Sequence, residues 1–170
     1  MITLFQNKLN KQLGTHPSYT ALLRAFRSSE FSLEVEGAEG AFFAFLLERL
    51  FRNAKSPFLV VTPTEQEAKA VVDDLSLLTE RAFLFPWWET LPWSGNTPAP
   101  HVSGERIHQL VRMLDGETFV LVASLRAFLC PVPPPEQVRR QIISLKKGDA
   151  IDPVELEQTL QRYRYLRVPK

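Results

Sequence analysis

The sequence predicts an α/β fold built around a parallel sheet. Three short apolar runs, at 58–62, 82–85 and 118–123, indicate strands, and the first and last are as continuously apolar as strands buried on both faces. Segments with helical periodicity separate these runs, and strands that alternate with helices indicate right-handed βαβ crossovers. A length of 170 residues accommodates one ordinary domain and part of a second.

The first third of the chain predicts two helices and a short strand. Residues 1–30 predict a helical lead-in with one apolar face, and residues 31–36 predict a strand. Residues 39–52 predict a helix that is apolar nearly all round, so we expect it to be buried on more than one side. The apolar face of the lead-in comprises Tyr19, Leu22, Leu23 and Phe26.

Capping signals place the helices that follow. Thr64 with Glu67 predicts a capping box for a helix that reaches about Leu78. A proline-broken loop is expected at 86–102, and a helix is expected from Ser103 to about Leu114. Further along, an Asp115-Gly116 turn precedes the third strand, and Ser124 is expected to cap a short helix that ends near Leu129.

A proline-rich segment divides the chain. Residues 131–136 predict a stiff linker between an α/β domain at 1–130 and the start of a small α+β domain at 137–170. In the second part we expect a strand at 137–145, a turn at 146–149, a helix and a last strand at 163–168. Asp152 and Pro153 are the N-cap and first residue of that helix.

Composition excludes several classes of protein. A formal net charge of +1 gives no overall attraction to nucleic acid or membrane, although 138–170 carries eight basic and four acidic residues. The one cysteine, Cys130, excludes an internal disulfide and a multi-cysteine metal site. We expect neither a signal peptide nor a membrane span, and therefore a cytoplasmic protein.

The segment from 31 to 47 has the strand–glycine–helix layout of a phosphate-binding loop without its chemistry. A working loop reads G-x-x-x-x-G-K-[ST], in which Lys reaches the terminal phosphates and Ser or Thr holds magnesium. Counting from Gly37, the second Gly position is Phe42, the Lys position is Phe43 and the Ser/Thr position is Ala44, while Gly40 lies inside the loop. We therefore expect no bound cofactor, no catalysis by this chain, and an architecture that now binds a partner.

Two other groups of side chains are candidate sites. Trp87, Trp88 and Trp93 lie in the 86–102 loop, where they are expected to pack the loop onto the sheet or to contact a partner or bases. His101, Glu105 and His108 resemble a metal constellation weakly, but no fourth ligand is evident, so no metal is expected.

Basic residues in the last third are candidates for binding. One group is expected to be either ordinary solvated charge or a phosphate contact. A second group surrounds the predicted last strand and has the residue types of interface anchors, or of a solvated strand edge. The first group is Arg139, Arg140, Lys146 and Lys147, and the second is Arg162, Arg164, Arg167, Tyr163 and Tyr165.

Several of these strings resemble one family. The string Pro86-Trp-Trp-Glu-Thr-Leu-Pro92, followed by Ser94 to His101 and Ser103-Gly-Glu-Arg106, resembles the "W-E-x-L-P-Y … S-P … I-S-x-R" stretch of bacterial transcription-repair coupling factor, Mfd. Val122-Ala-Ser-Leu-Arg-Ala127 and Leu145-Lys-Lys-Gly-Asp149 are similar to its later segments. The resemblance spans roughly 31 to 168.

The resemblance implies a fold and a role. It implies the N-terminal, UvrB-like region: a degenerate helicase-like (P-loop/RecA-like) domain 1a, then an incomplete domain 2, without domain 1b. It implies UvrA as the partner, an autoinhibitory contact within the intact protein, and UvrA binding near Arg167. In some family members that arginine falls one position earlier, where this chain has Leu166.

For the intact protein the resemblance implies an ATP- and magnesium-dependent translocase that acts on RNA polymerase and double-stranded DNA. Two alternatives remain at this stage. One is a UvrB-like or helicase domain with residual nucleotide binding. The other is a DNA-binding module that uses the tryptophan loop and the basic tail.

Overall fold

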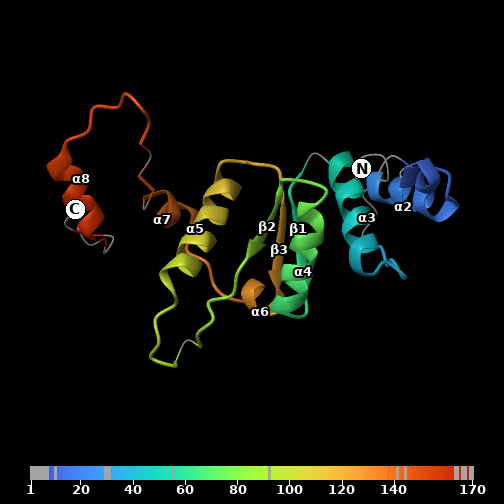
Figure 1. Ribbon diagram of the computed structural model, residues 1–170, viewed down its shortest axis with the longest axis horizontal. Coiled ribbons are helices and arrows are strands. Elements are labelled where there is room, and N and C mark those ends of the chain that lie inside the picture. The colour runs from blue at the N-terminus through green and yellow to red at the C-terminus, as the bar shows by residue number, and fades with distance from the viewer. Residues whose placement is uncertain are drawn as a thin grey trace.

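The computed structural model describes residues 8–9, 11–28, 32–54, 56–91, 93–140, 142–143, 145–162, 165 and 168. Its elements follow one another along a body that begins at α2 and α3 and ends in an arm that carries α8 (Figure 1). They are α2 (Pro17–Arg27), α3 (Gly40–Asn53), β1 (Phe58–Thr62), α4 (Glu65–Ser76), β2 (Ala82–Phe85), α5 (Pro100–Leu114), β3 (Val120–Ser124), α6 (Leu125–Phe128), α7 (Pro135–Arg140) and α8 (Pro153–Arg162).

The three strands form one parallel sheet in the order β1-β3-β2. Val122 of β3 lies opposite Val60 of β1 on one side and Leu84 of β2 on the other. All five residues of β3 are buried, as expected for a central strand. The predicted α/β class and the parallel sheet are therefore confirmed.

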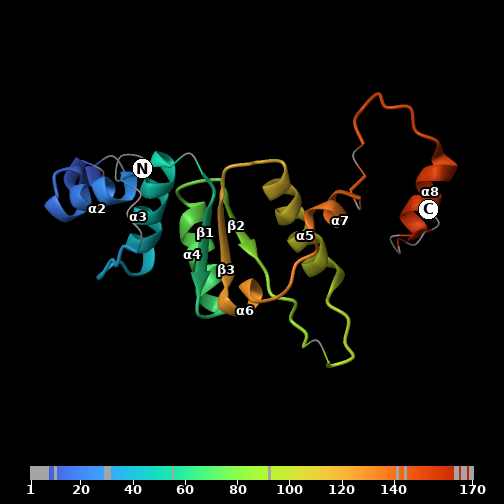
Figure 2. The same ribbon diagram turned by 180° about the vertical axis from the view of Figure 1, so that it is seen from behind.

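Helices cover the sheet in two layers (Figures 1 and 2). On one face α3 and α4 pack over a core that includes Ala44, Ala68 and Val122. On the other face α5 and α6 cover a second core around Phe85 and Phe119. Helix α3 carries a run of buried residues from Ala44 to Glu48, which confirms that it is buried on more than one side.

The edge strand β1 differs from its prediction. Side chains of Leu59 and Val61 are 51% and 42% exposed, so β1 is not buried on both faces. The sequence pattern of β1 is as apolar as that of β3, but β1 lies at the edge of the sheet, while β3 has a neighbour on each side. Apolar continuity alone does not distinguish an edge strand from a central one.

Capping residues act as predicted. The Thr64 hydroxyl accepts a hydrogen bond from the Glu67 amide at 3.2 Å and donates one to the Glu67 carboxylate at 2.9 Å. Ser124 accepts from the Ala127 amide at 3.0 Å and caps α6. Gly116 follows the end of α5 with a φ of +73°, the left-handed conformation that glycine adopts freely.

Three predicted elements differ from the structure. Residues 32–36 form no strand, and Ser32 has a φ of +65°, which interrupts an extended backbone. The predicted strand at 137–145 is wrong. Residues 137–140 belong to α7, because Pro135 and Glu136 supply a favourable first turn and Val138 packs inward with 1% exposure. The described residues 142, 143 and 145 are in no strand. Helix α5 begins three residues earlier than predicted, at Pro100 rather than Ser103, again with proline in its first turn.

The second part of the chain is only partly described. A turn at 146–149 is present, in which the Asp149 carboxylate accepts from the Lys146 amide at 2.7 Å. Helix α8 begins after Asp152, whose carboxylate accepts from the Val154 amide at 2.8 Å. Most of the predicted strand at 163–168 lies outside the described residues, and neither Tyr165 nor Val168 is in a strand.

Candidate interaction site

The carboxyl ends of the three strands lie at one edge of the sheet. Because the strands are parallel, Thr62, Phe85 and Ser124 end together there. The loop at 86–99 leaves this edge directly after β2. In open α/β sheets this is the edge at which ligands usually bind, so the loop is the first candidate site. We call residues 86–99 the tryptophan loop.

A buried arginine holds the start of the tryptophan loop. The Arg106 side chain comes from α5 and is 1% exposed. Its Cζ lies 4.0 Å from the ring centre of Phe85 and 4.3 Å from that of Trp88, so the guanidinium is stacked between two aromatic rings. Its Nη1 donates to the Pro86 carbonyl at 2.6 Å.

Burial of Arg106 has an electrostatic consequence. Removal from water disfavours the charged form and lowers the pKa of the Arg106 guanidinium from its usual value, while Cys130 and Glu65 act in the opposite direction. Among the described residues, Arg106 Nη2 and Gln109 Oε1 are buried side-chain atoms without a hydrogen-bond partner. The two ring faces and the Pro86 carbonyl therefore offset part of the cost of burying the cation.

A second arginine–tryptophan contact lies beside the first. The Cζ of Arg126, in α6, is 4.7 Å from the ring centre of Trp87. Helix α6 is itself fixed to this edge, because the Ser124 hydroxyl donates a hydrogen bond to the carboxylate of Glu65 at the start of α4. Two cation–aromatic contacts thus attach Trp87 and Trp88 to helices on the second face of the sheet.

The third tryptophan is different. Trp93 is 84% exposed, and its neighbour Leu91 is 51% exposed. Ser94 makes the turn here, since its amide donates to the Leu91 carbonyl at 3.1 Å and its hydroxyl donates to the same oxygen at 2.8 Å. The structure therefore divides the tryptophan loop into a packed start and an exposed tip at Trp93.

Sequence reasoning named the three tryptophans but not the role of Arg106. The signal was present, because Val102, Arg106 and Gln109 are the buried residues of α5 and recur at helical spacing. An arginine within the buried stripe of a helix indicates a cation that is paired or stacked inside the protein.

The segment expected to resemble a phosphate-binding loop does not have the order strand, loop, helix among its described residues. The residues before Gly37 form no strand, although Gly37 and Gly40 have the positive φ values of +75° and +53°. At the start of α3, Phe42 is 41% exposed and Ala44 is 1% exposed. Phe43 packs against the core that α3 and α4 cover. The Phe43 and Ala44 positions are therefore occupied by packing side chains.

The remaining candidate residues lie in α5, in α7 and in the arm before α8. In the described ranges, no group of three or more His, Cys, Asp and Glu residues could hold a metal ion, and this covers His101, Glu105 and His108. Arg139 donates to the Leu114 carbonyl at 3.3 Å, which ties α7 to the end of α5. Lys146 and Lys147 are exposed in the arm before α8.

The predicted partner-binding residues lie at the end of the chain. Arg162 is exposed at the last position of α8, and Tyr165 is 65% exposed with its amide donating to the Leu160 carbonyl at 3.0 Å. Helix α8 has no buried residue and lies apart from the sheet and its helices (Figure 1). Arg164, Arg167 and Tyr163 lie outside the described residues.

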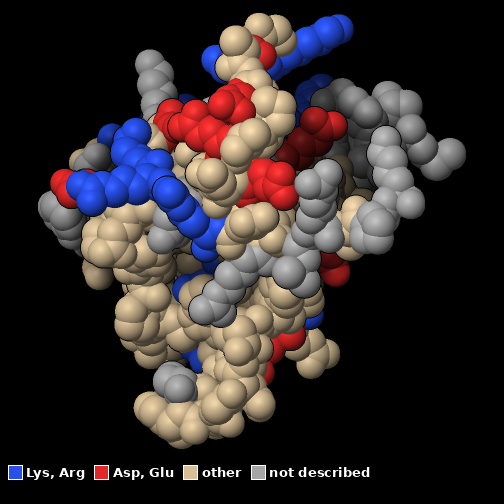
Figure 3. All heavy atoms as spheres, turned by 90° about the vertical axis from the view of Figure 1, so that its left-hand side faces the viewer, with Lys and Arg blue, Asp and Glu red and all other residues tan. Residues whose placement is uncertain are grey.

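Acidic side chains gather on this end of the molecule as well. Figure 3 views the α8 side, where Asp and Glu atoms lie close to Lys and Arg atoms, and an uncharged protrusion extends at the bottom. In sequence, residues 90–104 carry no charged side chain. The two surfaces of the candidate site thus have different chemistry: mixed charge near α8 and uncharged atoms at the tip of the tryptophan loop.

The chain resembles several curated proteins that share one name. The transcription-repair-coupling factor of Haemophilus influenzae is 28% identical over 71% of this chain. That of Bacillus subtilis is 26% identical over 77% of this chain. A third, from Borreliella burgdorferi, is 21% identical over 81% of the chain. The chain is similar to transcription-repair coupling factors.

The chain corresponds to only a small part of each coupling factor. The chain spans only 11–12% of the length of the curated relatives. The match is consistent with the expected N-terminal region of the coupling factors. No protein-family model matches the chain, and no solved structure matches it.

The helices of the described residues were compared with the requirements for a membrane span. Within the described ranges, no helix combines the length and apolar character that crossing a bilayer requires.

Proposed function

We propose that the chain is part of a transcription-repair coupling factor and serves it as a docking module rather than as a catalyst. The observation that carries the proposal is the similarity to coupling factors over 71–81% of the chain. The packed Phe43 and Ala44 positions support a non-catalytic role, because neither side chain can hold a phosphate or magnesium. The intact protein, in this proposal, is an ATP- and magnesium-dependent translocase on double-stranded DNA that displaces stalled RNA polymerase.

The proposed partner of this region is the repair protein UvrA. Its proposed docking surface is the end of the chain around Arg162, Tyr165 and Arg167. Two features support this choice. Helix α8 has an apolar side without a buried residue, which includes Val154 at 62% exposure, and exposed Tyr165 has the amphipathic character of an interface anchor. In the resting intact protein this surface is masked by an intramolecular contact, and the motor exposes it.

Calorimetric titration of the 170-residue chain with UvrA tests the proposal. We expect binding that weakens at least about tenfold in Arg167→Glu and in Tyr165→Ala, because such anchors typically carry more than about 1.4 kcal/mol. Lys69→Glu is the matched control, since Lys69 is an exposed cation on α4, away from α8. It should bind UvrA as the wild type does.

Two results would contradict the proposal in different ways. Absence of UvrA binding by the wild-type chain would remove the recruitment role. Binding that survives both substitutions would keep the role and move the docking surface to another part of the chain, with the tip of the tryptophan loop the next to be substituted.

A further inference from the structure

An open groove lies between α2, the segment 33–38 and the start of α3, and its volume is about 710 Å³. Helices α2 and α3 are at one end of the molecule, opposite the arm that carries α8 (Figures 1 and 2). The groove is therefore remote from the chain end proposed to bind UvrA. We call it the α2–α3 groove.

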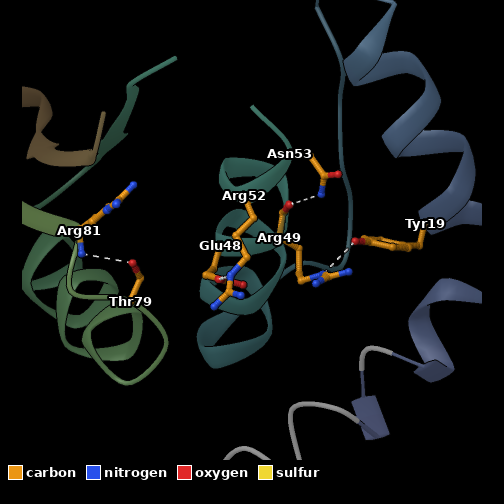
Figure 4. Close-up of polar contacts among 7 residues, drawn as sticks. All are labelled: Tyr19, Glu48, Arg49, Arg52, Asn53, Thr79 and Arg81. Carbon is orange, nitrogen blue, oxygen red and sulfur yellow. Dashed lines mark hydrogen bonds and ion pairs between the residues drawn. The ribbon is translucent and has the colours of Figure 1, made fainter. Parts of the chain in front are cut away.

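Contacts with α3 and β1 hold α2 in place as one wall of the groove. The Tyr19 hydroxyl accepts a hydrogen bond from Arg49 Nε of α3 at 3.4 Å (Figure 4). Near the other end of α2, Phe26 meets Phe58 of β1 edge to face, with ring centres 5.8 Å apart. These contacts fix the position of α2 relative to α3, so the groove between them has a defined shape.

Two helices present side chains to the groove at helical spacing. Phe42 and Leu46 of α3 lie one turn apart, and Phe42 is 41% exposed. The groove stripe on α2 has the spacing i, i+3, i+4, i+7 and contains mostly small side chains, so another backbone can approach it closely. Such stripes accept a further helix by ridge-into-groove packing, which favours a helix as the occupant. The groove stripe on α2 is Ser18, Ala21, Leu22 and Ala25.

The third wall of the groove is apolar and exposed. Leu33 and Val35 line it and are 41% and 46% exposed. With Phe42 they place large apolar side chains of two separate segments on one open groove. Exposed apolar side chains that gather in this way indicate a surface that another molecule covers.

The Asp and Glu side chains that line the groove are Glu34 and Glu36, and both are exposed. The Lys and Arg residues of 8–28 and of α3 do not line it; they are Lys8, Lys11, Arg24, Arg27, Arg49 and Arg52. Arg27 is instead held by Asn53, to whose Oδ1 its Nη2 donates at 3.0 Å. The charges that an occupant would touch along the 33–38 wall are therefore negative, and they favour basic residues beside its apolar stripe.

We propose that the α2–α3 groove binds an amphipathic helix of a protein partner. The apolar residues of that helix pack on the α2 and α3 stripes, and its Lys or Arg residues lie beside Glu34 and Glu36. Helix α8 of a second copy fits this groove poorly. It has no buried residue, but its first half carries Glu155 and Glu157, which would bring carboxylates to a wall that already has two.

Fluorescence anisotropy with a labelled peptide of about 16 residues, long enough to form a helix on binding, tests the proposal on the 170-residue chain. The peptide has Leu at i, i+3, i+4 and i+7 and Lys beside this stripe. Ala21→Lys puts a long cation into the groove and should weaken binding at least about tenfold. Thr20→Lys is the matched control, because Thr20 is exposed on α2 outside the groove stripe, and it should bind as the wild type does.

A second variant tests the charges alone. Glu34→Gln/Glu36→Gln keeps the shape of the wall and should weaken binding about threefold to tenfold at low salt. It should leave unchanged the affinity for a peptide that has Gln in place of Lys. Glu80→Gln/Glu105→Gln is the matched control, since it removes the same charge from exposed carboxylates that do not line the groove.

Several results would overturn the proposal. They are absence of peptide binding by the wild type, equal binding of a scrambled peptide of the same composition, and an Ala21→Lys variant that binds as the wild type does. Wild-type dimers in sedimentation that become monomers in Ala21→Lys would assign the groove to a second copy instead. If Ala21→Lys loses helical circular dichroism, the comparison of the two Glu→Gln variants decides.

Discussion

The Arg106 guanidinium lies 4.3 Å from the ring centre of Trp88, although the two residues come from α5 and from the loop after β2. The same guanidinium donates to the Pro86 carbonyl. One buried cation therefore fixes both the backbone and a ring at the point where the tryptophan loop leaves the sheet. Two substitution series test this relationship.

The first series removes the cation. Arg106→Ala should lower the free energy of unfolding by roughly 2 to 4 kcal/mol, because it opens a cavity between two rings and leaves the Pro86 carbonyl without its donor. Arg106→Lys should recover only part of this loss, since an ammonium group lacks the planar fork that stacks. Urea unfolding measures both, with exposed Arg24→Ala as the control. An Arg106→Ala variant as stable as the control would contradict the stacking argument.

The second series compares two tryptophans of the same loop. Trp88→Ala should cost about 2 kcal/mol or more in unfolding free energy, because its ring covers the buried guanidinium. Trp93→Ala should change it by no more than about 0.5 kcal/mol, because 84% of Trp93 is exposed. Equal effects in thermal or urea unfolding would show that the loop is packed along its whole length.

The capping box of α4 gives a third test. Thr64→Ala should cost about 1 kcal/mol, because the Glu67 amide loses its acceptor. Glu67→Ala should cost less, and the double variant should cost less than the two single losses together, because the residues share reciprocal bonds. Strict additivity in urea unfolding would contradict a shared capping box.

Helix α7 gives a fourth test. Val138 is 1% exposed and lies in a helix that packs against α5. Val138→Asp should destabilise the protein by roughly 3 kcal/mol or more, since it buries a carboxylate without a partner. The neighbouring Gln137→Asp is exposed and should be nearly neutral. If both variants unfold at the same urea concentration as the wild type, α7 does not belong to the packed body.

Nucleotide binding is the fifth test. Calorimetric titration with Mg-ATP should give no saturable heat, because Phe43 and Ala44 occupy the Lys and Ser/Thr positions of the loop and Glu36 and Glu39 add negative charge beside it. The positive control is a working phosphate-loop ATPase titrated with Mg-ATP under the same conditions. A dissociation constant in the low-micromolar range would restore the nucleotide-binding alternative.

Local sequence patterns predicted most of the helices and strands. Thr64 with Glu67 and Ser124 placed two helix starts, because capping needs only neighbouring residues. The apolar runs placed three strands, but not their order in space. Leu59 and Val61 have the composition of a buried strand and are exposed because of where β1 lies in the sheet, which no local pattern contains.

The errors have related causes. A strand is expected at 137–145, but Pro135 and Glu136 favour a helix whose Val138 packs on α5. Arg106 carried no motif of its own, because a stacked, buried cation depends on Phe85 and Trp88, which lie some twenty residues away in sequence. The domain boundaries and the partner-binding residues remain predictions.

The position of β3 in the sheet has a consequence for biosynthesis. Strands β1 and β2 pair only with β3 within the described sheet, and β3 is the last of the three to be synthesised. Until Val120–Ser124 leaves the ribosome, two apolar strands have their helices but no sheet neighbour, and such unpaired edges are prone to aggregation. We therefore expect slower translation of the segment between Phe85 and Val120 to lower the yield of soluble protein.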